Sequence, residues 1–218
     1  GPSESASFRR TCFVRSGRKE KAMCGRYYAD GQTAKEVERL VKRTERGFSP
    51  RPAGDVYPSG LAEVIYADRG QLTAGSMKWG FGPYEKRGLL INARAESVTE
   101  KSAFRDSIRH RRCVIPARWF YEWNRAKEKA SFLDPEGGTL YMAGCYREFD
   151  GQNCFVILTT CANPSVAGVH DRMPLLLESR ELEAWIFDNE KLEYFLGKTP
   201  KGLERKMEYE QQTLVFPQ

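Results

Sequence analysis

The sequence lacks the histidine and cysteine spacing that binds metal ions. It has only 2 histidines, His110 and His170, far apart in the chain, and none of its 6 cysteines forms a Cys-x-x-Cys pair. Zinc sites need clustered ligands of these types, so we expect neither a metal ion nor another cofactor. Scattered cysteines are also typical of a reducing intracellular compartment rather than of a disulfide framework.

Long apolar runs and the signatures of common enzyme classes are missing as well. No stretch is long enough to span a bilayer, and the first residues contain no apolar core of a secretory signal. There is also no phosphate-binding loop, dinucleotide fingerprint, metalloprotease helix or nucleophile elbow. We therefore expect a protein without membrane association, whose chemistry is not that of these motifs.

The surplus of positive charge is small once the first residues are set apart. The formal net charge is +6 over 218 residues. Residues 1–23 carry 6 Lys or Arg against 2 Glu, which is +4, so residues 24–218 account for the remaining +2. Net charge is thus no argument for nucleic acid binding. A local basic cluster between Arg94 and Arg118 suits phosphate contacts, and an ordinary solvated surface is an equally good interpretation.

The length of the chain suits one domain preceded by a short extra segment. Gly1-Pro2 resembles a scar of protease cleavage, so we expect residues 1–23 to be a leader or tag remnant, with an upstream start as the alternative. Residues 24–218 contain no repeat, linker or low-complexity tract. We expect them to form a single domain that is a monomer.

Strand patterns dominate the rest of the chain. A capping box at Thr33 predicts a helix over 33–45, and the prolines and glycines of 47–60 predict a loop. Further short helices are predicted at 102–110, 164–169, 179–185 and 190–197. Strands are predicted at 62–66, 72–79, 89–91, 113–115, 119–123, 130–133, 139–147, 153–160 and 175–177. This pattern favours an α+β domain with a mainly antiparallel β-sheet core and short peripheral helices.

Met23-Cys24 has a chemical potential that no internal cysteine shares. If translation begins at Met23 and the methionine is removed, Cys24 carries a free α-amine beside its thiol. This aminothiol can condense with one aldehyde carbon, because the amine forms an imine and the thiol then closes a thiazolidine ring. Both groups are partly reactive near neutral pH, since their pKa values are about 7.7–8.0 and about 8.5. Taken alone, a Met-Cys pair is a weak signal.

Glu122 is a candidate acid or base. In an extended strand, Trp119, Tyr121 and Trp123 share one face, whereas Glu122 shares the other with Phe120. A carboxyl group in this apolar setting would be partly desolvated, which raises its pKa toward acid–base catalysis. The alternative is a glutamate paired with an arginine.

Three other polar residues can be considered as site residues. Two of them, His170 and Arg94, each allow two interpretations, and the third, His110, is not expected to be catalytic. His170, beside Asp171 and Arg172, is either an oriented acid or base or a hydrogen-bonded structural histidine. Arg94 either binds phosphate or pairs with Glu96. His110, among arginines, is expected on the surface.

Six short blocks together resemble one family, the SOS-response-associated peptidases (SRAP). The blocks occur in the order and approximate spacing of that family and cover residues 23 to about 187. They are Met23-Cys24-Gly25-Arg26, Met77-Lys78-Trp79-Gly80-Phe81, Ile91-Asn92-Ala93-Arg94-Ala95-Glu96, Cys113-Val114-Ile115-Pro116-Ala117, Phe120-Tyr121-Glu122-Trp123 and His170-Asp171-Arg172-Met173-Pro174. Six ordered blocks are far more specific than any one of them.

The resemblance implies a sensor of abasic sites in single-stranded DNA within the DNA damage response. Its fold would be a closed, barrel-like sheet with surrounding helices. Cys24 would trap the open-chain aldehyde of the abasic sugar as a thiazolidine, giving a DNA–protein cross-link. The partner would be single-stranded DNA containing abasic sites, without a cofactor. The location would be cytoplasmic, and nucleoid-associated when bound to DNA.

The resemblance also implies roles for other residues. Glu122 would be the acid or base that promotes sugar opening, His170 would assist ring opening, and Asn92 would hold the amine of Cys24. The residues implied to contact DNA are Arg26, Arg94, Arg172, Trp79, Phe81 and Thr159. The three arginines would contact phosphates, the two aromatic rings would form apolar walls for flanking bases, and the threonine would lie near the adduct.

The chain departs from the family in one loop. Where the family commonly has Asn-Val-Ala-Pro, this chain has Asp55-Val56-Tyr57-Pro58. A carboxylate in place of the amide would repel a nearby phosphate, which puts a DNA contact by Asp55 in doubt. Near Lys101 the family has a phosphate-binding arginine. The alignment there is loose, so it does not decide whether Lys101 takes the place of that arginine.

Two other functions remain as alternatives. In the first, Cys24 is the nucleophile of a peptidase, with His170 as base, and acts on its own leader. In the second, the protein is a non-covalent module for single-stranded or branched DNA, and Cys24 has no role. Reversible, salt-dependent binding that survives the loss of the Cys24 thiol would favour the second.

Overall fold

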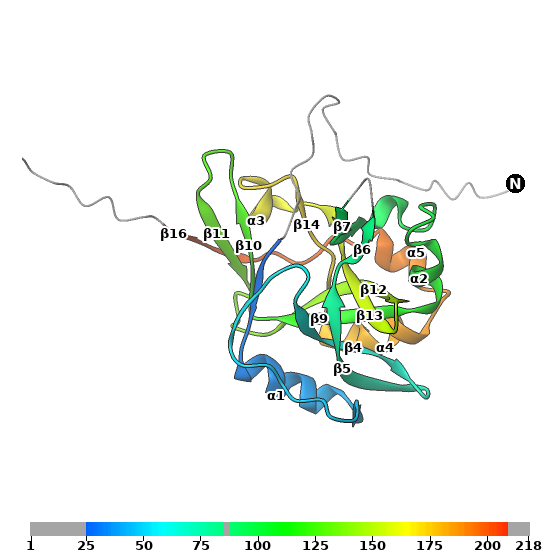
Figure 1. Ribbon diagram of the computed structural model, residues 1–218. Coiled ribbons are helices and arrows are strands. Elements are labelled where there is room, and N and C mark those ends of the chain that lie inside the picture. The colour runs from blue at the N-terminus through cyan, green and yellow to red at the C-terminus, as the bar shows by residue number, and fades with distance from the viewer. Residues whose placement is uncertain (1–24, 85–87, 209–218) are drawn as a thin grey trace, which may run out of the picture.

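The computed structural model describes residues 25–84 and 88–208 (Figure 1). The predicted leader, residues 1–23, and Cys24 therefore lie outside the described residues. Two large sheets, one two-stranded ribbon and a set of short helices make up the described part, in agreement with the predicted α+β class.

A five-stranded barrel forms the centre of the molecule. Its strands are β4 (Leu61–Asp68), β5 (Gln71–Trp79), β9 (Arg112–Ala117), β12 (Leu140–Phe149) and β13 (Gln152–Cys161). Neighbouring strands are antiparallel, except that β13 also pairs with β5 in parallel at Cys154–Lys78 and Phe155–Trp79. This last pairing joins the two ends of the sheet, which confirms the predicted barrel-like closure.

The turn between β4 and β5 explains why these strands form a tight hairpin. Arg69 and Gly70 have φ values of 48° and 74°. Two consecutive residues with positive φ form the type of two-residue turn whose twist matches that of the flanking strands.

A second sheet packs beside the barrel. Its order is β16 (Glu204–Glu208), β11 (Lys129–Leu133), β10 (Trp119–Trp123), β1 (Tyr27–Ala29) and β3 (Gly54–Val56), and all its neighbours are antiparallel. Only Arg118 separates β9 of the barrel from β10 of this sheet. Three of its strands correct the sequence-based prediction. The expected loop 47–60 contains β3, which forms because its backbone pairs with β1, and both β1 and β16 lie where no element was expected.

Six short strands complete the sheets. Three of them, β8 (Asn92–Arg94), β14 (Arg172–Pro174) and β15 (Leu176–Leu177), pair with β13 or β12. The pair β6 (Phe81–Tyr84) and β7 (Gly88–Leu90) forms a separate ribbon, and β2 (Arg43–Thr44) adds to β5 in parallel.

The helices are short and lie around the barrel. They are α1 (Gly31–Leu40), α2 (Arg105–His110), α3 (Pro164–Ala167), α4 (Leu182–Phe187) and α5 (Leu192–Leu196), with 3₁₀ turns η1 (Ala95–Ser97) and η2 (Ser179–Glu181). These positions confirm the expected peripheral helices, with shifted ends. No helix in the described ranges combines the length and apolarity that crossing a membrane requires.

The first helix corrects the predicted boundaries 33–45. Its cap is Asp30, whose carboxylate accepts hydrogen bonds from the backbone N–H groups of Gln32 and Thr33, each at 3.0 Å. Thr33 is thus the third helical residue rather than the cap. The helix ends at Leu40, because Val41 is extended and the chain that follows pairs with β5 as β2.

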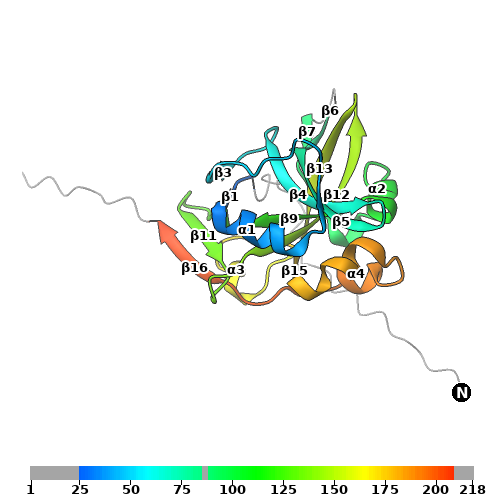
Figure 2. The same cartoon turned by 90° about the horizontal axis from the view of Figure 1, so that it is seen from below.

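The core has two layers because barrel strands alternate. On β13, Phe155 and Ile157 point to the layer inside the barrel, which continues to the second sheet, whereas Val156 and Leu158 point to the helices. Figure 2 shows α2 and α4 on one side of the barrel and β1, β11 and β16 on the other. The inner layer thus connects the barrel with the second sheet, where most candidate site residues lie.

Candidate functional site

Asn92 is held at the edge of the barrel by two hydrogen bonds to the preceding carbonyl group. The oxygen of Ile91 accepts from the backbone N–H of Ile157, at 3.1 Å, and from the indole N–H of Trp79, at 3.0 Å. These bonds join β8 to β13 and to the ring inside the barrel. Asn92 is half-buried at the start of β8.

The first described residues are fixed between the barrel and β10. The ring of Tyr27 packs against that of Trp79, with 5.3 Å between centroids. The carbonyl oxygen of Arg26 accepts a hydrogen bond from the backbone N–H of Tyr121, at 3.1 Å. The start of β1 is therefore beside the strand that carries Glu122 and near the ring that holds β8. Cys24 itself is not described, and its role stays a prediction.

Glu122 lies on the inner side of the second sheet, as its strand alternation predicted. Its neighbour Phe120 belongs to the inner core layer, and Glu122 itself is only 3% exposed. Burial withdraws the carboxyl group from water, which agrees with the predicted desolvation. The predicted acid–base role stays a prediction.

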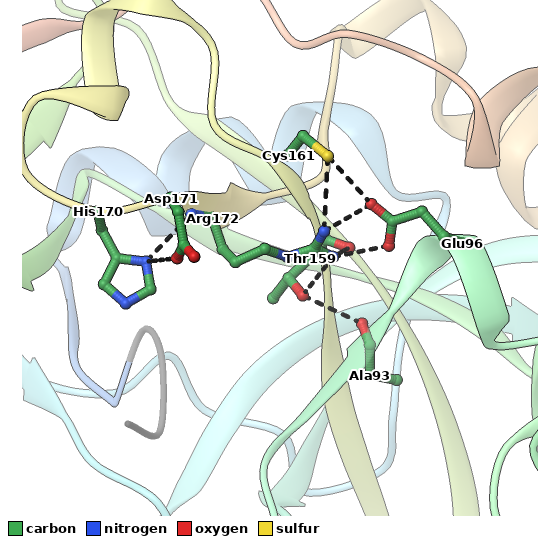
Figure 3. Close-up of polar contacts among 7 residues, drawn as sticks. All are labelled: Ala93, Glu96, Thr159, Cys161, His170, Asp171 and Arg172. Atoms are coloured by element: carbon green, nitrogen blue, oxygen red, sulfur yellow. Dashed lines mark hydrogen bonds and ion pairs between the residues drawn. The ribbon is translucent and has the colours of Figure 1, made fainter. Parts of the chain in front are cut away.

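His170 is oriented by its own loop. Its Nδ1 atom accepts a hydrogen bond from the backbone N–H of Arg172, at 3.1 Å, and lies 3.1 Å from Asp171 Oδ1 (Figure 3). When Nδ1 accepts in this way, the neutral ring carries its proton on Nε2. Figure 3 shows Nε2 on the side of the ring away from these two contacts. The imidazole is thus positioned, which fits both predicted interpretations.

Arg172 and Glu96 form a two-pronged ion pair. Arg172 Nη1 and Nη2 donate to the two oxygens of Glu96 at 2.6 and 2.8 Å, and Nη2 also donates to the carbonyl oxygen of Thr159 at 2.7 Å (Figure 3). Burial of Glu96 tends to raise the pKa of its carboxyl group, but the hydrogen bonds and charge of Arg172 outweigh burial and lower that pKa. Arg172 is 8% exposed.

This pairing bears on two predicted phosphate contacts. The guanidinium of Arg172 faces Glu96 and Thr159 inside the protein, and its predicted contact with DNA phosphate stays a prediction. Arg94 is exposed at the end of β8, and its charge also lowers the pKa of Glu96, with a smaller effect than that of Arg172. The predicted phosphate contact of Arg94 likewise stays a prediction.

Thr159 joins the strands on both sides of β13. Its hydroxyl donates to the carbonyl oxygen of Ala93 at 3.4 Å, and it is 2% exposed. Its backbone pairs with Arg94 of β8 and with Pro174 of β14. Thr159 thus connects the strand of Asn92 with the strand that follows His170, and its predicted position near an adduct stays a prediction.

The prediction that Trp79 and Phe81 wall the flanking bases is wrong. Both side chains are 0% exposed. The Trp79 ring stacks on Phe155, with 6.1 Å between centroids, and Phe81 packs against Phe104 and Phe149. They fill the two core layers, where a base cannot reach them.

Arg26 lies in a cluster that the sequence did not reveal. Its guanidinium forms an ion pair with Asp55 at 3.6 Å and lies over the rings of Tyr57 and Trp123, 4.7 and 5.3 Å from their centroids. Asp55 also accepts a hydrogen bond from the Tyr121 hydroxyl at 3.0 Å. The acidic residue of the unusual loop is thus balanced by Arg26. The shared face of Trp119, Tyr121 and Trp123 was the signal that could have revealed this cluster.

Two further features concern ligands. Lys101 is exposed after η1 and stays a possible phosphate contact. Within residues 25–84 and 88–208, no group of three or more His, Cys, Asp or Glu side chains could hold a metal ion.

The contacts above connect the predicted catalytic residues of the described chain around the inner core layer. Asn92 lies on β8 and His170 just before β14, and both strands pair with the C-terminal half of β13. Glu122 is linked to them through β1 and Trp79. A buried carboxyl group and an oriented imidazole are groups that can transfer protons, and their joint action on a nucleophile stays a prediction.

Comparison with known proteins identifies clear relatives. The family description "SOS response associated peptidase (SRAP)" matches residues 23–211. The abasic site processing protein YoaM of Bacillus subtilis is 31% identical over 183 residues, which is 75% of this chain and 79% of YoaM. The abasic site processing protein YedK of Escherichia coli is 28% identical over 178 residues, 75% of this chain and 79% of YedK.

A solved structure shows the same fold. A crystal structure of a Bordetella bronchiseptica protein superposes with a TM-score of 0.71 at 20% identity, covering 85% of this chain and 100% of that protein.

Proposed function

Because the chain belongs to the SOS response associated peptidase (SRAP) family, we propose that it processes abasic sites in single-stranded DNA by capturing them covalently through Cys24. Its relatives YoaM and YedK are both named abasic site processing proteins. The substrate would be the open-chain form of the abasic sugar, which carries an aldehyde at C1′.

The proposed reaction has two bond-forming steps. The α-amine of Cys24 adds to the aldehyde carbon, and loss of one water molecule gives an imine. The thiol sulfur then adds to the same carbon, and its proton passes to the imine nitrogen as the thiazolidine ring closes. The sum is aldehyde plus aminothiol giving thiazolidine plus water, with no oxidant or reductant.

The described residues would move protons in this sequence. Glu122, buried beside the start of β1, would take the proton from the amine and return it to the departing hydroxyl group. His170, with its ring oriented through Nδ1, would assist opening of the sugar. Asn92 would hold the amine by its side-chain amide.

One observation carries the proposal beyond family membership. The hydrogen bond between the Arg26 carbonyl group and the Tyr121 N–H fixes the residue two positions after Cys24 beside the strand of buried Glu122. A nucleophile at the first residue of a trimmed chain would thus lie close to a desolvated carboxyl group.

The test uses protein that begins at Cys24, mixed with a single-stranded oligonucleotide that contains one abasic site. We expect a cross-link that survives heating in denaturant. Cys24→Ala should abolish it, and Cys154→Ala, which removes a thiol from the barrel, should not. Cys24→Ser keeps the amine but cannot close the sulfur ring, so it should give only an imine that borohydride traps.

Blocking the amine provides the decisive control. Protein that keeps residues 1–23 has an amide at Cys24 and should not cross-link. Equal cross-linking by this longer form, shown to be intact by mass spectrometry, would overturn the aminothiol mechanism. Release of residues 1–23 by the purified protein, dependent on Cys24 and His170, would support the peptidase alternative instead.

A further inference from the structure

The outer side of the second sheet carries a continuous set of aromatic rings, which we call the aromatic face. Strand alternation turns Phe120 and Glu122 of β10 inward and the rings between them outward. The face consists of Tyr28, Tyr57, Trp119, Tyr121 and Trp123. Tyr57 is 48% exposed, and the rings of Tyr28, Trp119 and Trp123 are half-buried. These rings are separate from the two core layers.

The rings touch one another across three strands. Tyr28 of β1 stacks on Trp119 of β10, with 4.1 Å between centroids and 1° between planes. Trp119 meets Tyr121 edge-on at 6.4 Å, and Tyr121 lies 6.4 Å from Trp123. Arg26 extends the set to Tyr57, because its guanidinium lies over both Trp123 and Tyr57. The result is an ordered surface of rings rather than isolated side chains.

Cationic groups are interleaved with these rings. Besides Arg26, Lys129 Nζ lies 4.1 Å from the centroid of the Tyr121 ring. Arg118 stands at the start of β10 and pairs with Asp30 at 3.4 Å. Aromatic residues and arginine are also enriched in protein–protein interfaces, so a second copy of the chain is an outcome that the experiments below test. Alternating rings and cations suit a strand of nucleic acid, whose bases stack and whose phosphates are negative.

Hydrogen-bond donors are in excess in the same region. In the described part of the chain, three buried donor nitrogens of this region have no hydrogen-bond partner: Arg26 Nε, Arg51 Nε and Trp119 Nε1. Arg118 Nε also makes no hydrogen bond, but it forms the ion pair with Asp30. Phosphodiester oxygens and base carbonyl groups are acceptors, so a nucleic acid strand offers what the face lacks.

We propose that the aromatic face binds the single-stranded DNA that flanks the captured abasic nucleotide. Bases would stack on Tyr57 and on the Tyr28–Trp119 pair, and phosphates would lie near Arg118 and Lys129. The face is continuous with the proposed capture site, because Arg26 belongs to it through its side chain and fixes the start of β1 through its carbonyl group. The inference rests on the proposed function, which supplies single-stranded DNA as the substrate.

The first experiment measures binding without capture. The full chain is titrated into an undamaged, labelled single-stranded DNA of about 16 nucleotides, a length in the usual range for such proteins, and anisotropy gives Kd at fixed salt. Tyr57→Ala and Trp119→Ala should each weaken binding about tenfold, the effect of losing one base–aromatic stack. Tyr57→Phe and Trp119→Phe keep a ring and should retain most of the affinity.

The matched control is Tyr194→Ala. Tyr194 is also an exposed aromatic residue, 64% exposed, but it lies on α5, outside the second sheet. Its loss should leave Kd unchanged. Wild-type affinity in both Tyr57→Ala and Trp119→Ala, or no measurable binding of undamaged DNA, would overturn the inference. Circular dichroism of each variant separates a lost contact from a lost fold.

A second experiment separates this inference from the proposed function. Protein that begins at Cys24 and carries Tyr57→Ala should reach the same final cross-linked fraction as its parent, but at about tenfold higher protein concentration. If neither the parent protein nor its variants cross-link, but Tyr57→Ala and Trp119→Ala still weaken binding, covalent capture is wrong and DNA binding by the aromatic face is supported. If cross-linking proceeds and these variants change neither Kd nor the protein concentration needed for cross-linking, DNA binding by the aromatic face is wrong and covalent capture is supported. A change of oligomeric state in the face variants would instead identify a second copy of the chain as the occupant.

Discussion

The barrel and the aromatic face use the same residue types for opposite purposes. In the barrel, Trp79 is 0% exposed. Beside the barrel, Arg172 of β14 donates hydrogen bonds to both oxygens of Glu96. On the face, Trp119 is half-buried and Arg26 holds Asp55 through one longer contact of 3.6 Å. Buried tryptophan and arginine side chains stabilise the fold. The same side chains can bind a ligand where they are partly exposed to solvent. Burial, rather than residue type, distinguishes the two roles.

The largest expected difference is in the unfolding free energy lost on replacing Trp79 of the barrel and Trp119 of the aromatic face. Trp79→Ala should destabilise the protein by about 3–5 kcal/mol, because it empties a large volume in the inner core layer. Trp119→Ala should cost about 1–2 kcal/mol, since a half-buried ring loses less apolar contact. Urea unfolding of the two variants measures this difference. Equal losses of stability would contradict the division into core and face.

The two arginine pairs provide the next contrast. Arg172→Ala leaves the carboxylate of Glu96 without its main partner, and we expect a loss of about 2–3 kcal/mol. This is below the range for fully buried pairs because the Glu96 side chain is 37% exposed. Arg180→Ala, which breaks an exposed pair with Glu178, is the control and should cost less than about 1 kcal/mol. Thermal or urea unfolding that shows no difference would argue against a structural role for Arg172.

The carboxyl groups of Glu96 in η1 and Glu63 in β4 should respond to pH with opposite signs. Arg172 lowers the pKa of Glu96 against the effect of burial, so its contribution to stability is present above about pH 4.5 and is lost as pH falls through the folded-state pKa. Burial, followed by the charge of Glu38, raises the pKa of Glu63 to about 6. The Glu63 side chain is 7% exposed. Its ionisation therefore destabilises the folded state as pH rises from about 4.5 through about 6.

Glutamine variants of these residues test the signs. Glu63→Gln should stabilise the protein by about 1–2 kcal/mol at pH 8 relative to its effect at pH 4.5. Glu96→Gln should destabilise it at pH 8 and have less effect at low pH. Stability curves from urea unfolding across this pH range give both results. A parallel pH dependence of the two variants would contradict the assigned environments.

The smallest expected effect lies on the face. Asp55→Asn removes a partly exposed ion pair with Arg26 and should change the unfolding free energy by less than about 1 kcal/mol. It should nevertheless tighten binding of single-stranded DNA a few-fold, because one negative charge leaves a surface that meets phosphates. The anisotropy titration described above measures this change. Weaker binding would mean that Asp55 is needed to hold Arg26 and Tyr121 in place.

Much of the fold was accessible from the sequence because strand and turn signals are local. The hairpin at Arg69-Gly70, the alternation of β10 and the short helices all follow from neighbouring residues. The errors arose where a distant partner decides. β3 forms in a proline-rich stretch only because β1 is available to pair with it, and α1 stops early because β5 pairs with the residues that follow.

The candidate site was accessible in part, for a similar reason. Alternation placed Glu122 opposite Trp119, Tyr121 and Trp123, and the family blocks singled out Asn92 and His170. Nothing in the sequence distinguished Trp79 in the core from Trp119 on the face, since both lie in strand patterns next to apolar residues. The pairing of Arg172 with Glu96 joins residues 76 positions apart, which local patterns cannot reveal.

The sequence by itself determined which side chains share a face of each strand, because a strand places successive side chains on opposite sides whatever surrounds it. It also determined membership of a family, through six blocks in order. Only the tertiary structure decided which face is enclosed, because enclosure depends on what packs against the strand. Closure of the barrel by β13 and β5 put Trp79 in the interior, and the single-residue connection at Arg118 led the chain into a sheet whose outer side keeps its rings near water.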